Sequence, residues 1–122
     1  MKTHLTIEEV AKRTGLTAYT LRYYERISLI APVGRAAGGQ RRYATSDMAW
    51  IEFLLRLRTT HMPIGMMQTF AQLRGLGDAT IPARRQLLEE HLQTTLASME
   101  AMRQAAQALE TKIAHYKSIE AT

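Results

Sequence analysis

Apolar residues recur every three or four positions along most of this chain, which is the spacing of one face of an α-helix. In the first such stretch, Ile7, Val10 and Ala11 form a stripe behind Thr6 and Glu9. A threonine followed three residues later by a glutamate is typical of a capping box, in which each side chain accepts a hydrogen bond from the other residue's backbone amide. The pattern predicts a short helix that begins just after Thr6.

A second short helix is predicted directly after the first. Gly15 suits the left-handed conformation that ends many helices, and Thr17 can cap the helix that follows. Leu21 and Tyr24 then fall on an inward face. Other faces of this helix carry Ala18, Tyr19 and Arg22. Two capped helices around a glycine predict a helix-turn-helix, an arrangement that other small helical domains also contain.

The segment after Ile30 is predicted to form a β-hairpin, because Pro32 and three glycines between residues 33 and 40 interrupt any helix. Arginines flank its tip: Arg35 on one side, Arg41 and Arg42 on the other. A guanidinium suits phosphate because its planar donor fork binds two acceptor oxygens at once. The hairpin therefore presents three candidate phosphate ligands, with a solvated surface loop as the alternative.

Two further helices are predicted to complete a helical core. Ser46 or Asp47 can open the first of them. Its apolar face consists of Trp50, Ile51, Leu54, Leu55 and Leu57. Pro63 starts the next at its first helical position, where a proline loses no needed hydrogen bond, and Gly75 and Gly77 end it. Its stripe consists of Ile64, Met67, Phe70 and Ala71.

From Pro82 to about Ser118 no glycine or proline interrupts the chain, which predicts one long helix. At 1.5 Å per residue it extends about 55 Å, more than a domain of this size covers internally. Residues in steps of four and three along it form the a/d seam of a coiled coil: Leu88, Leu92, Thr95, Met99, Met102, Ala106, Leu109, Ile113 and Tyr116. A second copy of the helix is the economical partner, and folding back onto the N-terminal part is the alternative.

Charge is distributed unevenly along the chain, whose formal net charge is +5. Residues 1 to 60 hold ten Lys and Arg against five acids, whereas residues 61 to 122 hold six of each. A basic first half beside a neutral second half is expected of a phosphate-facing domain attached to another element. Surface Lys and Arg that serve only solubility give the same count.

Several kinds of chemistry have little support in this sequence. It contains no cysteine, which excludes disulfides and thiolate metal sites, and its four histidines lack the short spacing of a helical zinc site. If two long helices cross antiparallel near Met102, His91 approaches the partner's His115, although neither lies on the seam. We find no catalytic arrangement and no glycine-rich phosphate loop, and we expect no enzyme, metal or cofactor. No signal peptide or membrane span is predicted, so we expect a cytoplasmic protein.

The run Thr20-Leu21-Arg22-Tyr23-Tyr24-Glu25, continued by Leu29 and Ile30, resembles the first helix-turn-helix of the MerR family of bacterial transcriptional regulators at nearly every position. The resemblance covers nearly the whole chain. It implies a mainly α fold, with a winged helix-turn-helix DNA-binding domain at residues 1–77. A small β-hairpin wing belongs to this domain. A linker and a long dimerisation helix, which forms an antiparallel coiled coil, follow at 78–122.

Two positions depart from the pattern of the family. MerR-like wings end in Gly, an aromatic residue, Arg, any residue and Tyr; Gly39, Arg41 and Tyr43 match, but Gln40 replaces the aromatic residue. His61 stands where the family usually has glycine, which is expected to alter that turn.

The resemblance implies a homodimer that places each second helix in a major groove of a palindromic operator in double-stranded DNA. The first turn of a recognition helix points into the groove, so the candidates near base edges are Thr17, Ala18, Tyr19 and Arg22. Contacts with the DNA backbone are expected from Tyr23, Arg26, Arg35, Arg41, Arg42, Tyr43 and Arg58.

As the family works, the dimer distorts a promoter for RNA polymerase, and an effector shifts it toward the activating state. Neither an effector domain nor a cysteine-bearing loop follows Ser118 in this sequence, so any effector is unidentified and not bound through a thiol. The alternative is a helical interaction protein that recruits a partner through its C-terminal coiled coil, with DNA binding secondary.

Overall fold

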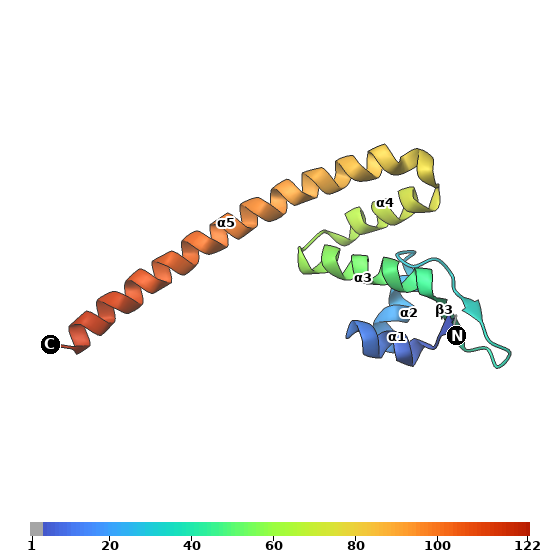
Figure 1. The fold of residues 1–122 in the computed structure, drawn as a ribbon, viewed down its shortest axis with the longest axis horizontal. Helices are drawn as coiled ribbons and strands as arrows, with labels where there is room; N and C mark the ends of the chain where they lie inside the picture. The colour runs from blue at the N-terminus through green and yellow to red at the C-terminus, as the bar shows by residue number, and fades with distance from the viewer. Residues whose placement is uncertain (1–3) are drawn as a thin grey trace. The chain divides into compact units, whose positions relative to one another are not determined.

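The computed structural model describes residues 4–122 and is mainly helical, with one small antiparallel sheet (Figure 1). Its elements, in chain order, are β1 (His4–Leu5), α1 (Ile7–Thr14), α2 (Ala18–Arg26), β2 (Gly34–Arg35), β3 (Arg41–Ala44), α3 (Thr45–Thr59), α4 (Ile64–Gly75), the 3-10 turn η1 (Asp78–Thr80) and α5 (Ile81–Glu120). The chain divides into two compact units at Arg84 and Arg85, and each is described by itself.

The helix-turn-helix forms as the sequence predicts. Thr6 Oγ1 accepts a hydrogen bond from the Glu9 amide at 3.1 Å, and a Glu9 carboxylate oxygen accepts one from the Thr6 amide at 3.2 Å, which completes the capping box. Gly15 ends α1 in the left-handed conformation, with φ of 76°. Thr17 caps α2 by accepting from the Thr20 amide. Both predicted caps are therefore confirmed.

Two of the following turns place a residue other than glycine in the left-handed region: Ser28 (φ 64°) after α2 and His61 (φ 61°) after α3. At His61 the amide donates to the Arg58 carbonyl, and the next amide, of Met62, reaches back to Leu57. This is a Schellman motif, in which the left-handed residue is usually glycine. His61 therefore keeps the turn but pays the steric cost of a side chain at positive φ.

The sheet has the strand order β1-β3-β2, and both pairings are antiparallel. β2 and β3 form the predicted hairpin, in which Arg35 pairs with Arg41. β1 was not predicted; it pairs Leu5 with Tyr43 on the other edge of β3. The N-terminal strand therefore fixes the wing to the start of α1.

The hydrophobic core of the first unit lies among α1, α2, α3, α4 and β3. Val10, Leu21, Ile51 and Leu54 are almost completely buried in it. Two predicted helix starts are off by one or two residues: α3 begins at Thr45, with Asp47 accepting from the Ala44 amide, and α4 begins at Ile64, just after Pro63. Ile64 was predicted to lie on the apolar stripe of α4, and this prediction is wrong. Its side chain is exposed, because Ile64 is the first residue of the helix.

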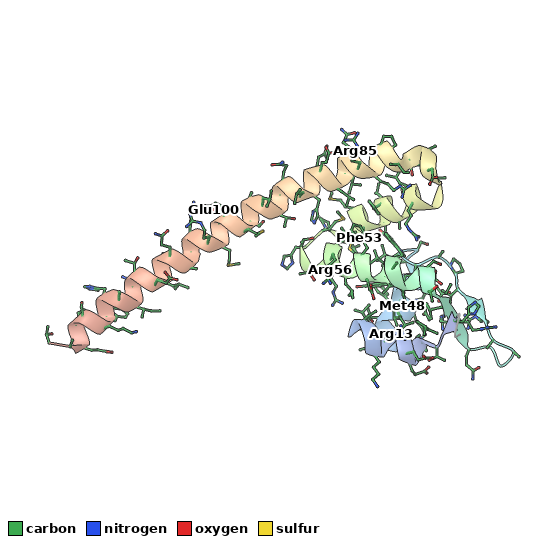
Figure 2. The ribbon with its side chains drawn as sticks, viewed as in Figure 1. Arg13, Met48, Phe53, Arg56, Arg85 and Glu100 are labelled. Carbon is green, nitrogen blue, oxygen red and sulfur yellow. The ribbon has the colours of Figure 1, made fainter. Side chains whose placement is uncertain are left out.

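Aromatic rings join α3 to α4. Trp50 stacks on Phe70 with ring centroids 5.7 Å apart. The ring of Phe53, which is labelled in Figure 2, lies 5.8 Å from that of Phe70. The Arg74 guanidinium lies 4.5 Å from the centroid of the Trp50 ring. These contacts hold the second helical pair as a rigid support behind the helix-turn-helix.

The second unit consists of α5 from Arg85 onward and the last two residues. Ion pairs between Arg85 and Glu89 and between Glu100 and Arg103 lie along its surface, as expected for charges three or four residues apart (Figure 2). From Leu92 onward its large apolar side chains are exposed in the single chain. The helix therefore has an apolar face that its own unit does not cover.

Candidate nucleic-acid interface

The outer surface of α2 carries the side chains predicted to meet DNA. Leu21 and Tyr24 are buried and anchor the helix, so the remaining faces are free to bear polar and aromatic groups. Tyr19 is 67% exposed and Tyr23 is 36% exposed, and Arg22 is also exposed. A short helix anchored on one side therefore presents two tyrosines and an arginine to solvent.

A surface hollow of about 780 Å³ lies between α2, the wing and the segment that joins β1 to α1. Four arginines line it: Arg22 from α2, and Arg35, Arg41 and Arg42 from the wing. Among the described residues that line it, Glu8 is the one acidic side chain. Such a concentration of guanidiniums makes the hollow suited to an anionic ligand.

These arginines differ in the partners that they already have. Nε of Arg41 donates to a Glu25 carboxylate oxygen at 2.6 Å. Arg35 donates to the Gly39 carbonyl at 3.0 Å, and an Arg42 nitrogen lies 3.2 Å from Nδ1 of His4. Among residues 4–122, only Arg41 of the four is paired with a carboxylate. The other three keep their charge available for phosphate.

Glu25 connects α2 to the wing. Its second carboxylate oxygen accepts a hydrogen bond from the Val33 amide at 3.4 Å, just before β2, while the first binds Arg41 on β3. One side chain therefore holds both strands of the hairpin against the end of α2. The sequence does not predict this role, because the partners of Glu25 lie eight and sixteen residues away in a segment with no periodic pattern.

Tyr43 does not occupy the position predicted for a backbone contact. Its side chain is 0% exposed, and its hydroxyl has no hydrogen-bond partner among the described residues. Burial, and then the nearby Glu25 carboxylate, raise the pKa of Tyr43. We therefore correct the prediction: in this structure Tyr43 is a core residue, because side chains alternate along β3 and Tyr43 lies on its buried face, opposite to that of the exposed Arg42.

The C-terminal end of α2 is held by two long-range hydrogen bonds that were also not predicted. Nε1 of Trp50 on α3 donates to the Leu29 carbonyl at 2.8 Å, and Nε2 of Gln68 on α4 donates to the Ile27 carbonyl at 3.0 Å. Ile27 is the C-cap of α2, where a carbonyl has no partner within the helix, and Leu29 lies in the turn that follows. The two hydrogen bonds attach the end of α2 and the turn after it to α3 and α4.

The remaining predicted DNA contacts differ in accessibility. Thr17 is exposed but its hydroxyl already caps α2, and Ala18 is only half-exposed. Arg26 and Arg58 are exposed, Arg26 on α2 and Arg58 near the end of α3, and neither lines the hollow. The structure thus brings together Arg22 and the wing arginines, and leaves Arg58 on a separate part of the surface of the first unit.

The predicted seam residues of α5 are largely exposed in the single chain. Leu92, Met99, Met102, Ala106, Leu109, Ile113 and Tyr116 are exposed, and Leu88 and Thr95 are partly buried. Leu96 and Ile119, which were not predicted, add to the exposed apolar surface.

Within residues 4–122 no helix is long and apolar enough to cross a membrane. The same part of the chain contains no group of three or more His, Cys, Asp or Glu side chains placed to hold a metal ion.

Comparison with known proteins agrees with a DNA-binding role for the arginine-lined surface beside α2. Residues 6–43 match the model of the MerR family regulatory protein. A transcriptional regulator of the helix-turn-helix type from Haemophilus influenzae, itself uncharacterised, is 32% identical over 116 residues, which are 95% of this chain and 86% of that protein. The chain belongs to the MerR family. As a MerR regulator it is a DNA-binding transcriptional regulator and not an enzyme.

Solved MerR structures extend the likeness to the long helix. The crystal structure of HiNmlR, a MerR family regulator lacking the sensor domain, bound to promoter DNA, has a TM-score of 0.88 and 31% identity and covers 98% of this chain and 94% of that one. A MerR family protein from Listeria monocytogenes has a TM-score of 0.86 and 33% identity, covering 93% and 86%. The regulator AdhR of Bacillus subtilis is 43% identical over 89 residues, and the match spans 73% of this chain and 64% of AdhR.

Proposed function

We propose that this MerR regulator binds a palindromic promoter operator as a homodimer, with one α2 in each of two major grooves. The observation that supports this most is the arginine-lined hollow directly beside the exposed face of α2. A helix whose first turn enters the major groove brings its flanks close to the phosphates of both strands. The wing arginines lie where those phosphates pass.

The side chains divide into two roles under this proposal. Tyr19 and Arg22 reach base edges, with Thr17 and Ala18 shaping the first turn of α2. Tyr23, Arg26, Arg35, Arg41, Arg42 and Arg58 contact the DNA backbone and set the register without reading sequence. Tyr43 is removed from this set because it is buried.

Dimerisation is proposed to occur through α5. The apolar residues from Leu88 to Tyr116 recur at the spacing of a coiled-coil seam, and most are exposed in the single chain. An antiparallel pair of these helices buries both seams at once and holds two DNA-binding domains at a fixed separation. Two domains related by a two-fold axis match the symmetry of a palindromic operator.

Regulation is proposed to work through promoter shape. Two domains on a rigid helix pair can hold the DNA between them bent or untwisted, which changes how RNA polymerase meets the promoter. HiNmlR, which lacks a sensor domain, was crystallised on promoter DNA. This supports operator binding by a similar fold without a separate sensor, and an effector for the present protein is unidentified.

The test is a pair of arginine variants measured on sites selected from random duplexes. Arg22→Ala is expected to lower discrimination between the operator and single-base variants by about 1–3 kcal/mol, because a bidentate contact to guanine is lost. Arg42→Ala is expected to weaken binding to all duplexes alike. It should also lower the slope of log affinity against log salt concentration by about one, the value of one lost phosphate contact. We choose Arg42 for this test and not Arg41, because removal of the Arg41 side chain also deprives Glu25 of its partner. Arg85→Ala, an exposed change on α5, is the control.

If the two variants behave alike across the operator variants, the division between base and backbone contacts is wrong. A second candidate function follows from the exposed face of α5: recruitment of a different helical protein. Sedimentation of the purified protein alone separates the two, since self-association supports the regulator and a monomer at micromolar concentration supports recruitment.

A further inference from the structure

Arg26 is the last residue of α2, and within residues 4–122 no carboxylate pairs with it. Its neighbours are aromatic instead. The guanidinium carbon lies 5.6 Å from the centroid of the Tyr23 ring and 6.0 Å from that of the Tyr19 ring. The nearest acid in sequence, Glu25, binds Arg41 and the Val33 amide. The charge of Arg26 is therefore held by two rings and is left unneutralised.

The spacing of these three residues explains the contact. Positions 19, 23 and 26 follow one another by four and three, so they share one face of the helix. Aromatic rings attract a guanidinium through their negative faces, and the planar group also packs flat against them. A side chain otherwise free to adopt many rotamers is thereby restricted on the surface that faces solvent. Both tyrosines remain exposed enough to contact a further ligand.

We propose that Tyr19 is a positioning residue for Arg26, and that with Tyr23 it holds the guanidinium ready for a DNA phosphate. The inference rests on the proposed function, in which α2 enters the major groove. Tyr19 lies in the first turn of α2, and seven residues correspond to about 10 Å along the helix. Tyr19, Tyr23 and Arg26 together therefore extend from the base edges to the DNA backbone. Base contact by Tyr19 and phosphate contact by Arg26 are then energetically coupled.

A double-mutant cycle on the whole 122-residue chain tests whether Tyr19 positions Arg26 for phosphate. Tyr19→Leu removes the ring, Tyr19→Phe keeps it, and Arg26→Gln removes the charge. Affinity for a nonspecific duplex is measured over a salt series, because there base reading does not contribute. Tyr19→Leu is expected to weaken binding about threefold, as fits an exposed cation–π contact, and Tyr19→Phe to leave it unchanged. In the Arg26→Gln background, Tyr19→Leu is expected to have no effect.

An equal loss from Tyr19→Leu with and without the charge of Arg26 overturns the proposal, because Tyr19 then acts alone. NMR gives a readout without DNA: the side-chain protons of Arg26 should be shifted upfield by the rings in the native protein and in Tyr19→Phe. Absence of that shift also overturns it. Arg22→Ala separates the two levels of inference. If Arg22→Ala leaves operator discrimination intact, the proposed interface fails; if it abolishes discrimination while the cycle shows no coupling, only the positioning role fails.

Discussion

At the scale of single residues, Tyr43 shows best how the structure changes an assignment made from sequence. Its position in the wing motif indicated a phosphate contact, yet the hydroxyl is enclosed and has no partner in the described chain. A buried hydroxyl without a hydrogen bond costs about 1–3 kcal/mol relative to one that is paired. The Tyr43 ring therefore contributes to packing in the core, whereas its unpaired hydroxyl lowers the stability of the fold.

Tyr43→Phe tests this directly. The change is expected to raise the free energy of unfolding by about 1 kcal/mol and to leave operator affinity unchanged. Because burial raises the pKa of Tyr43, the native protein also loses stability as the pH rises above the ordinary tyrosine pKa, and the variant should lose less. Urea unfolding at pH 8 and pH 10.5 measures both effects, with Tyr19→Phe, on the exposed face of α2, as the control for unfolding. A fall in DNA affinity with unchanged stability contradicts the assignment of Tyr43 to the core.

At the scale of elements, the link between α2 and the wing determines the shape of the arginine-lined hollow. Glu25 binds Arg41 and the Val33 amide, so the hairpin is attached to the recognition helix and not only to its own strands. Both side chains of the ion pair are mostly buried, with 19% of Arg41 and 14% of Glu25 exposed. A partly buried charged hydrogen bond contributes more than a surface pair does.

Glu25→Gln keeps the shape of the side chain and removes its charge. We expect a loss of about 1–2 kcal/mol in stability, because Arg41 then lacks its carboxylate. We also expect weaker discrimination between DNA sites, because the wing no longer holds the flank of α2 in one register. Chemical denaturation and operator titration measure these quantities, and Glu8→Gln is the matched control on the rim of the same hollow. Equal effects of the two variants contradict the special role of Glu25.

Local patterns predicted the elements well, whereas contacts between distant segments were not predictable. The caps at Thr6 and Thr17 and the turn at Gly15 depend on neighbours within three or four residues, so the sequence determines them directly. β1 is only two residues long and gains its pairing from β3. The hydrogen bonds from Trp50 and Gln68 to the segment that ends α2 join residues 21 and 41 positions apart, and no periodic pattern in the sequence indicates them.

The same distinction applies to the candidate site. Arg22 and the three wing arginines were predicted one by one, from their place on a helix or beside a flexible tip, and the structure brings all four to one hollow. Which of them is already paired could not be predicted, because that depends on Glu25 and on how the hairpin folds over α2.

At the scale of the whole molecule, α5 is the element through which we propose that two DNA-binding units pair. Leu109→Glu places a charge in the proposed seam and is expected to convert the dimer to a monomer, because a buried unpaired carboxylate is strongly unfavourable. Gln107→Glu adds the same charge off the seam and should leave the dimer intact. Sedimentation velocity over a concentration series measures the result. Dimers of equal strength in both variants contradict the proposed seam.

The most direct test of the account is a footprint of the purified, untagged protein on the DNA upstream of its own gene, at physiological salt with nonspecific competitor DNA. Operator recognition by a dimer predicts one protected site with two symmetric halves on the same face of the duplex and a distorted centre that is hypersensitive to cleavage. Leu109→Glu should lose this pattern, and Gln107→Glu should keep it. A single unsymmetric half-site, or protection that Leu109→Glu leaves unchanged, contradicts operator recognition by a dimer.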